Sequence, residues 1–246
     1  MKAMVFAAGL GTRLRPLTDS RPKALVEVAG QTLLDHTLAR LREGGVTETI
    51  VNTHHFADAI ARHLKKRADL DMRVEISHED VLLDTGGGLK KAGWFFVENG
   101  NSEPFVVHNV DIISTIDLRR MADAHTRSGA LVTLAVRRRK TSRYLIFDEN
   151  LQLCGRGNQA RSQIDMARPC AGAQPLAFSG IHIISPRLLT MMTAEGPFPI
   201  IDFYLELSAS GEKICGYIDD QSYWRDLGRL EDLTKAGEEI ALWSGR

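Results

Sequence analysis

Apolar and polar positions change periodicity along the first half of the chain, which predicts strands and helices in alternation. Short apolar runs predict buried strands, and leucines at helical spacing followed by Gly44 and Gly45 predict a helix that stops there. The expected strands are 2–8, 48–52, 73–77, 104–113 and 130–136, and the expected helices are 32–43, 57–66, 88–97 and 118–127. Such alternation indicates a parallel sheet, and ligands bind these sheets at the carboxyl ends of the strands.

The second half of the chain is less regular. Residues 155–175 are polar, contain Gly, Pro and Arg, and lack periodicity, so they predict a loop. The other expected elements are a hairpin of 144–148 and 151–154, a strand at 176–185, and helices at 200–208 and 229–243. We therefore expect an α/β fold with a Rossmann-like mixed, mostly parallel sheet flanked by helices.

Composition and charge exclude several classes of protein. The 246 residues include 31 basic and 31 acidic ones, which argues against a nucleic-acid binder that relies on a general positive field. No stretch approaches the roughly 18 apolar residues of a membrane helix, and the short apolar run at the N-terminus lacks a cleavage site of the signal-peptide type. Three widely spaced cysteines form no disulfide framework or metal spacing. These features predict a cytoplasmic protein.

The stretch FAAGLGTRLRPLTDSRPKAL at 6–25 follows the first predicted strand. It does not match a dinucleotide-binding fingerprint, because Leu14 occupies the third glycine position and Pro16 and Pro22 fall where a helix would run. It also lacks the Gly-Lys-Ser/Thr ending of the common phosphate loop. An extended loop remains, with Gly9 and Gly11 in it.

Basic residues in this loop indicate a polyphosphate ligand. Glycines let backbone N–H groups approach an anion closely. Arg13 can form paired hydrogen bonds with phosphate oxygens, and Lys23 provides a mobile positive charge. Solvated loop charges are the alternative, but the position after the first strand favours phosphate contact.

The longer stretch AAGLGTRLRPLTDSRPKALVEVAG is similar to the signature of the sugar-1-phosphate nucleotidyltransferases, Gly-x-Gly-Thr-Arg-Leu-x-Pro-Leu-Thr followed by Pro-Lys. VNTHHFADAI, DTGGGLKKA and YWRDLGRLEDL resemble the branch that contains N-acetylmuramate-1-phosphate uridylyltransferase and mannose-1-phosphate guanylyltransferase-like enzymes. The resemblance implies one nucleotidyltransferase domain over 1–246. Its nucleotide-binding half would be 1–136, and 137–246 would form the sugar-binding half and the C-terminal helix.

The resemblance implies roles for individual residues. Arg13, Lys23 and Asp111 would be catalytic, and Asp111 and Asp226 would bind Mg²⁺. Asp111 ends an apolar strand, where a carboxylate needs a partner. Nucleotide contacts are expected from Ala8, Gly9, Gly11, Thr12, Arg13, Glu79, Thr85, Gly86 and Gly87. Sugar-phosphate contacts are expected from Lys23, Asn109, Arg143 and Gly180.

Some of these residues also have simpler interpretations. Asp111 could cap a turn, Asp226 could be the N-cap of the last helix, and the glycines of 85–88 could form a turn without a ligand. The basic run 137–143 could be a solvated surface, with Arg143 as its most plausible substrate contact. Arg13 and Lys23 are both expected on an exposed loop.

The implied reaction transfers a nucleotidyl group from a nucleoside triphosphate to a sugar 1-phosphate and releases pyrophosphate. UTP with N-acetylmuramate 1-phosphate or a related hexose 1-phosphate is the first expectation. Guanylyl transfer to mannose or heptose 1-phosphate and cytidylyl transfer to a non-sugar phosphate are alternatives. A silent nucleotide-sensing homologue is a third, because Val110 stands where the family commonly has Gly. No nucleic-acid or membrane partner is expected, and the protein is expected to be a monomer or homodimer.

Overall fold

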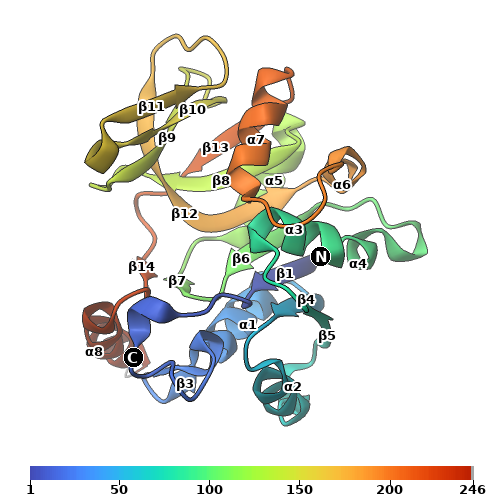
Figure 1. The fold of residues 1–246 in the computed structure, drawn as a ribbon, viewed down its shortest axis with the longest axis vertical. Helices are drawn as coiled ribbons and strands as arrows, with labels where there is room; N and C mark the ends of the chain where they lie inside the picture. The colour runs from blue at the N-terminus through green and yellow to red at the C-terminus, as the bar shows by residue number, and fades with distance from the viewer. Residues whose placement is uncertain (245–246) are drawn as a thin grey trace. The chain divides into compact units, whose positions relative to one another are not determined.

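The computed structural model describes residues 1–244, and its chain divides into two compact units (Figure 1). Unit 1 contains residues 1–82, 108–116 and the described residues from Ser222 onward. Unit 2 contains residues 83–107 and 117–221. The chain therefore leaves unit 1 twice and returns to it twice, so each unit is built from segments distant in sequence.

Unit 1 contains the parallel strands that the pattern predicts. Its strands β1, β4 and β5 pair in that order, all parallel, and Met4 lies opposite Ile50 in the register. The elements of unit 1 are β1 (Lys2–Phe6), η1 (Thr12–Leu14), η2 (Lys23–Leu25), β2 (Glu27–Val28), β3 (Gln31–Thr32), α1 (Leu33–Glu43), β4 (Glu48–Thr53), α2 (Ala57–Lys65), η3 (Ala68–Leu70), β5 (Arg73–His78), β7 (Ile112–Ser114), β14 (Trp224–Asp226) and α8 (Leu230–Ser244).

The helix predicted at 32–43 shows why these residues fold as they do. Thr32 is the N-cap of α1, and its Oγ1 accepts a hydrogen bond of 3.1 Å from Asp35 N. The leucines at helical spacing, Leu33, Leu34, Leu38 and Leu41, are all fully buried. Capping and an apolar face therefore define this helix together, as the spacing predicts.

Unit 2 is mainly antiparallel. Strand β12 pairs antiparallel with β8 and β9, β10 lies between β9 and β11, and β13 pairs parallel with β8. Helix α7 packs on β10 and β13 (Figure 1). The elements are α3 (Asp84–Ala92), α4 (Trp94–Val97), η4 (Glu98–Gly100), α5 (Leu118–Ser128), β8 (Val132–Arg137), β9 (Arg143–Phe147), β10 (Leu153–Asn158), η5 (Gln159–Arg161), β11 (Gln163–Met166), β12 (Gln174–Ile184), α6 (Arg187–Met191), α7 (Ile200–Ala209) and β13 (Ile214–Ile218). Strand β6 (Phe105–Asn109) runs from unit 2 into unit 1.

The prediction of a loop over 155–175 is wrong in its first half. Strand β10 continues to Asn158, and β11 returns antiparallel to it with Gly155 opposite Met166. Most residues of β11 are exposed, including the apolar Ile164 and Met166. A strand at the end of the strand order with little buried surface lacks the alternation of apolar and polar residues that reveals strands in a sequence.

The strand predicted at 104–113 is interrupted. Strand β6 ends at Asn109, Val110 and Asp111 form a turn, and β7 begins at Ile112. The fold class itself is confirmed, because the chain forms a mixed, mostly parallel sheet with helices on its faces. No helix within residues 1–244 is long and apolar enough to cross a membrane.

Candidate functional site

The glycine-rich loop of unit 1 folds back over the segment that carries Lys23. Gly11 has φ +64°, and a Cβ there would lie 3.0 Å from Thr18 Cγ2 and 3.1 Å from Lys23 Cβ. Thr18 Oγ1 donates a 2.8 Å hydrogen bond to Gly11 O. Both the conformation and the close approach therefore require glycine at position 11.

A buried amide side chain holds the start of this loop. The N–H groups of Ala7 and Ala8 donate to Asn52 Oδ1, at 2.7 and 3.3 Å. Asn52 Nδ2 in turn donates to Glu79 Oε1 at 2.7 Å. Glu79 is buried, and the hydrogen bond that its carboxylate accepts fixes the orientation of the Asn52 side chain within unit 1. Asn52 was not among the predicted site residues, although a polar residue within a buried strand is a signal that could have identified it.

Lys23 and Asp111 form an ion pair within unit 1, in which Lys23 Nζ donates to Asp111 Oδ2. The side chain of Lys23 is 10% exposed and that of Asp111 is 19% exposed. The expectation that Lys23 lies on an exposed loop is therefore wrong, whereas Arg13 is exposed as predicted. The sequence does not reveal that Lys23 is buried, because the burial results from the packing of η2, which carries Lys23, near the turn that carries Asp111.

Asp226 lies at the end of β14, opposite Ile112 in the antiparallel pair with β7. This pairing brings Asp226 near Asp111. Burial raises the pKa of Asp226, the charge of Asp111 raises it further, and Lys23 and Arg13 oppose the shift. Asp226 Oδ1 accepts a 2.8 Å hydrogen bond from Gly228 N, and helix α8 starts only at Leu230. Asp226 is therefore not the N-cap of that helix.

Arg13 lies near the same carboxylate, and its charge lowers the pKa of Asp226. A Cβ placed on Gly228 would lie 2.8 Å from Arg13 Nη2 and 2.9 Å from Asp226 Oδ1. Because Gly228 has no side chain, the Arg13 guanidinium has room to lie beside it. Unit 1 therefore brings Arg13, Lys23, Asp111 and Asp226 close together, and their packing also requires the glycine at position 228.

Two neighbouring carboxylates, one of them with a raised pKa, fit a divalent cation. Oxygen ligands suit Mg²⁺, which commonly takes one or two carboxylates and completes its shell with phosphate oxygens and water. Within residues 1–244 no group of three or more His, Cys, Asp or Glu side chains could hold a metal ion. Asp111 and Asp226 could therefore provide two ligands at most, and the substrate would have to provide others.

The glycines expected to contact the nucleotide in unit 2 do not form a loop before a helix. Thr85, Gly86 and Gly87 lie in the first turn of α3. A Cβ on Gly86 would lie 2.2 Å from Phe198 Cε2, and one on Gly87 would lie 2.5 Å from Gly196 O. The lack of side chains at Gly86 and Gly87 therefore allows residues 196–198 of the same unit to pack closely against α3.

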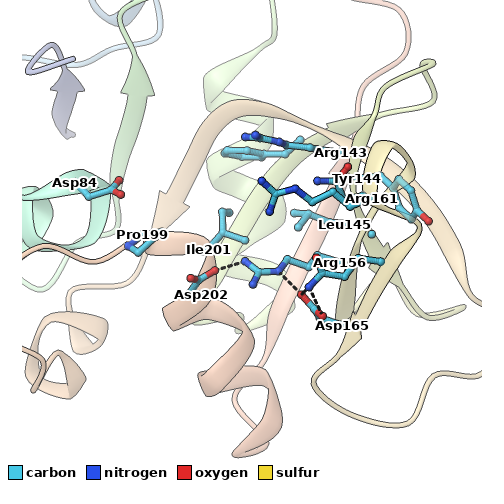
Figure 2. Close-up of a pocket in the computed structure, with 14 residues that line it drawn as sticks. Asp84, Arg143, Tyr144, Leu145, Arg156, Arg161, Asp165, Pro199, Ile201 and Asp202 are labelled. Carbon is cyan, nitrogen blue, oxygen red and sulfur yellow. Dashed lines mark hydrogen bonds and ion pairs between the residues drawn. The ribbon is translucent and has the colours of Figure 1, made fainter. Parts of the chain in front are cut away.

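A pocket of about 630 Å³ lies within unit 2 (Figure 2). Arg143, one of the residues expected to contact the sugar phosphate, is among its lining residues. Gly180 has φ +76° in β12, where the register with β8 shifts, and it does not line this pocket. Asn109 is the last residue of β6 and belongs to unit 1. The expected sugar-phosphate residues are thus divided between the two units.

Other residues lining the pocket were not predicted. The lining residues are Asp84, Arg143, Tyr144, Leu145, Arg156, Gly157, Asn158, Arg161, Gln163, Asp165, Phe178, Pro199, Ile201 and Asp202. Several of them come from β10, η5 and β11, which were predicted to be part of a loop. Because the sequence showed no strand there, it gave no reason to place these side chains on one surface.

Comparison with known proteins gives a consistent picture. Residues 2–156 match the model of a family described as nucleotidyl transferase. An N-acetylmuramate alpha-1-phosphate uridylyltransferase of Caulobacter vibrioides is 37% identical over 97% of this chain and 96% of its own length. Mannose-1-phosphate guanyltransferase beta-B of Xenopus laevis is 29% identical over 95% of this chain, but the match spans only 62% of that longer protein.

Solved structures share the fold. HddC from Yersinia pseudotuberculosis, in a complex with GMP-PN, covers 97% of this chain and 99% of its own with a TM-score of 0.78 at 21% identity. A UDP-glucose pyrophosphorylase in complex with UDP-glucose covers 100% of this chain and 99% of its own with a TM-score of 0.77 at 18% identity. At these identities the likeness establishes the fold alone.

Proposed function

Because the chain belongs to the nucleotidyl transferase family and is a nucleotidyltransferase, we propose that it transfers a nucleotidyl group from a nucleoside triphosphate to a sugar 1-phosphate. The single observation that carries this proposal is the grouping of Lys23, Arg13, Asp111 and Asp226 in unit 1. Two cations beside two carboxylates suit a reaction between two phosphorylated anions.

In this reaction a phosphate oxygen of the sugar 1-phosphate attacks the α-phosphorus of the triphosphate in line, and pyrophosphate leaves. The acceptor phosphate is already ionised near neutral pH, so no general base is required. The protein must align two anions and reduce their repulsion, which grows as the local dielectric falls. Lys23 and Arg13 provide positive charge at the reacting phosphates, and the N–H groups of the Gly9–Gly11 loop add hydrogen-bond donors.

We propose Mg²⁺ as the cofactor, with Asp111 and Asp226 as its protein ligands. When bound, the ion would neutralise charge on the phosphates. Lys23 Nζ donates a hydrogen bond to Asp111 Oδ2 in the structure, so Lys23 also limits the orientation of the Asp111 carboxylate. Asn52, fixed by Glu79, holds the first residues of the glycine loop through Ala7 and Ala8.

The finer assignment follows the most similar relative reported above. We propose UTP and N-acetylmuramate 1-phosphate, or a related hexose 1-phosphate, as substrates. Guanylyl transfer to mannose or heptose 1-phosphate is the second candidate, favoured by the similarity to the Xenopus protein. The pocket of unit 2 is proposed to bind the acceptor, with Arg143 in its wall. The product would be a nucleotide sugar for cell-wall or glycan synthesis in the cytoplasm.

A pyrophosphate-release screen of four nucleoside triphosphates against a panel of sugar 1-phosphates and phosphocholine tests the proposal. We expect turnover with UTP or GTP and a sugar 1-phosphate, dependent on Mg²⁺. Preferential use of ATP would contradict the proposed base. Turnover with CTP and phosphocholine would favour a cytidylyltransferase. Nucleotide binding without pyrophosphate release from any pair would favour a silent nucleotide-sensing homologue.

A further inference from the structure

The two carboxylates of the candidate site in unit 1 are carried by a ribbon of two short strands. Asp111 comes directly before β7, and Asp226 is the last residue of β14. Among the described residues, β7 and β14 pair only with each other. A backbone hydrogen bond of 2.8 Å from Leu227 N to Asp111 O joins the segments that carry the carboxylates. The relative position of the two carboxylates therefore depends on the register of this ribbon.

The ribbon is too short to hold its own position. Two isolated strands are at best marginally stable in water, and these strands have three residues each. At the end away from Asp111, Thr115 N donates to Tyr223 O at 3.0 Å, and Tyr223 N donates to Thr115 Oγ1 at 3.0 Å. These bonds close the ribbon but do not fix it against the rest of unit 1. Contacts with α1, which packs on β7, and with α8, which packs on β14, hold it in place (Figure 1).

Helix α8 holds β14 through one carboxylate. Glu239 accepts hydrogen bonds from Tyr223 Oη at 2.6 Å and from Arg225 Nε at 3.0 Å, and Arg225 Nη2 donates to it as well. The bond from Tyr223, followed by those from Arg225, lowers the pKa of Glu239, so this carboxylate is ionised near neutral pH. Arg225 precedes Asp226 on the strand, and successive side chains of a strand point to opposite sides. Glu239 therefore acts on Asp226 through the backbone of β14.

Helix α1 holds the other strand through one guanidinium. Arg40 Nε donates to Ser114 O at 2.9 Å, and Arg40 Nη2 donates to Ile116 O at 3.1 Å. Arg40 Nη1 donates to Glu43 on the same helix, which orients the guanidinium. The planar group thus binds two carbonyl groups at the end of β7, and a lysine could not present the same fixed fork of donors.

These contacts affect position more than overall stability. An exposed ion pair contributes little to the free energy of unfolding unless it is bidentate or part of a network. The side chains of Arg225 and Glu239 are 25% and 37% exposed, so their contribution to folding is modest. Without Glu239, however, β14 loses its side-chain attachment to α8, and a shift of β14 carries Asp226 with it. Mg²⁺ requires ligands in near-ideal octahedral geometry, so its binding is sensitive to such a shift.

Resting on the proposed function, we infer that Glu239 and Arg40 are positioning residues for the metal site. Glu239 fixes β14 and Arg40 fixes β7, and together they keep Asp226 beside Asp111 in the arrangement that a divalent cation requires. Both act through the backbone of the ribbon. Groups that orient metal ligands typically contribute 10- to 100-fold to metal affinity. Helix α8 is therefore part of what sets the affinity of this site.

The test measures metal binding and stability on the same variants. Electron paramagnetic resonance of the free ion gives the affinity for Mn²⁺ without substrates, and pyrophosphate release gives the Mg²⁺ concentration for half-maximal turnover. The variants are Glu239→Gln, Arg225→Gln, the combination of these two, and Arg40→Gln. Glu212→Gln is the matched control, because Glu212 accepts two hydrogen bonds from Arg187 in unit 2, at 2.9 and 2.6 Å.

Glu239→Gln and Arg40→Gln should each weaken Mn²⁺ binding about 10-fold and raise the Mg²⁺ requirement by a similar factor. The combined variant of Arg225 and Glu239 should resemble the single ones, because the two residues form one contact. Melting temperatures should fall no further than in Glu212→Gln, which should keep wild-type affinity for Mn²⁺. Unchanged Mn²⁺ affinity in Glu239→Gln or Arg40→Gln would overturn the inference for that residue. An equal loss of affinity in Glu212→Gln would overturn it for both, since the effect would then be general.

Amide hydrogen exchange separates this inference from the proposed reaction. The N–H of Leu227, bonded to Asp111 O, reports the register of the ribbon without metal or substrate. Glu239→Gln and Arg40→Gln should speed its exchange roughly 10-fold and leave the amides of β4 unchanged. Faster exchange in a protein that neither binds Mn²⁺ nor releases pyrophosphate would support the positioning of the carboxylates and contradict only the proposed function. Mg²⁺-dependent turnover with the same exchange and Mn²⁺ affinity in all variants would overturn the inference and leave the proposed function intact.

Discussion

Lys23 Nζ donates a hydrogen bond to Asp111 Oδ2, and both side chains are largely removed from solvent. The sequence separates these residues by 88 positions. The pair therefore has a structural role as well as the proposed catalytic one, because each charge is the other's partner in a partly desolvated place. Substitutions at this pair should affect stability and activity in different ways.

Lys23→Met should lower the free energy of unfolding by about 1–3 kcal/mol, because Asp111 loses its donor. Lys23→Met combined with Asp111→Asn should recover part of that loss, since no unpaired charge remains. Activity should fall in the single and double variants alike, by about 10²–10³ in kcat/KM for Lys23→Met. Chemical denaturation and pyrophosphate release measure the two effects. A Lys23→Met protein as stable as the wild type would show that the pair contributes nothing to folding.

Asp226→Asn should abolish stabilisation by Mg²⁺. Since burial and the charge of Asp111 raise the pKa of Asp226, its ionised form is disfavoured in the folded protein without metal. Without metal, the melting temperature of Asp226→Asn at pH 7 should equal or exceed that of the wild type. Added Mg²⁺ should raise the melting temperature of the wild type but not that of Asp226→Asn. Asp123→Asn, at an exposed position on α5, is the control. Overlapping Mg²⁺ titrations of wild type and Asp226→Asn would remove Asp226 as a ligand.

Gly228→Ala should displace Arg13, because the added Cβ would lie 2.8 Å from Arg13 Nη2. The loss in kcat/KM should approach that of Arg13→Ala, about 10²–10³, with little change in stability, since the Arg13 side chain is exposed. Gly237→Ala in α8 is the matched control. A Cβ there meets no atom within 4 Å, and alanine should stabilise the helix by about 1 kcal/mol. Wild-type turnover in Gly228→Ala would show that the position of Arg13 is unimportant.

Val110→Gly should lower the free energy of unfolding by about 1–3 kcal/mol and change sugar preference only modestly. Val110 is 5% exposed, and its N–H donates to Phe6 O at 3.2 Å. A buried valine lost without a replacement leaves a cavity. Thermal unfolding and the acceptor panel measure both effects. Unchanged stability with a new sugar activity would instead place Val110 in a substrate pocket.

Stability should fall as the pH drops from about 6.5 to about 4. Burial lowers the pKa of His125 to about 4, and it lowers that of His108 to about 4 as well. The unfolded chain therefore binds more protons than the folded protein in this range, so the folded state is fully favoured only above the unfolded pKa. His125 contributes on the order of 2–3 kcal/mol to this change.

His125→Gln tests that assignment. In the wild type Nδ1 of His125 lies 2.9 Å from Thr133 Oγ1, and Nε2 lies 3.0 Å from Ser185 Oγ. Glutamine can hydrogen bond but does not titrate, so the variant should be less stable at pH 7 and its stability should depend less on pH. Urea denaturation between pH 4 and 7.5 measures the slope. An unchanged slope would assign the dependence to other groups.

The sequence by itself determined the elements with strong periodicity and the chemistry of the phosphate loop. Buried strands such as β1 and the capped helix α1 are defined by local patterns, and Arg13, Lys23 and the two aspartates belong to motifs that are readable without a structure. Tertiary structure decided which of these residues are buried and what they contact. The pairing of β14 with β7 brings Asp226 near Asp111, and this long-range contact leaves no periodic trace in the sequence.

The pocket of unit 2 depended on the tertiary structure most. Its wall comes from β10, η5 and β11, whose polar residues are exposed or face a ligand-sized space and therefore do not alternate with apolar ones. The glycines of α3 indicated that another group packs closely against this helix, but only the tertiary structure showed that the group is the Phe198 side chain. Local sequence specifies backbone preference and burial, whereas the presence of Arg143 and Arg161 in one pocket follows from the pairing of β9 with β10.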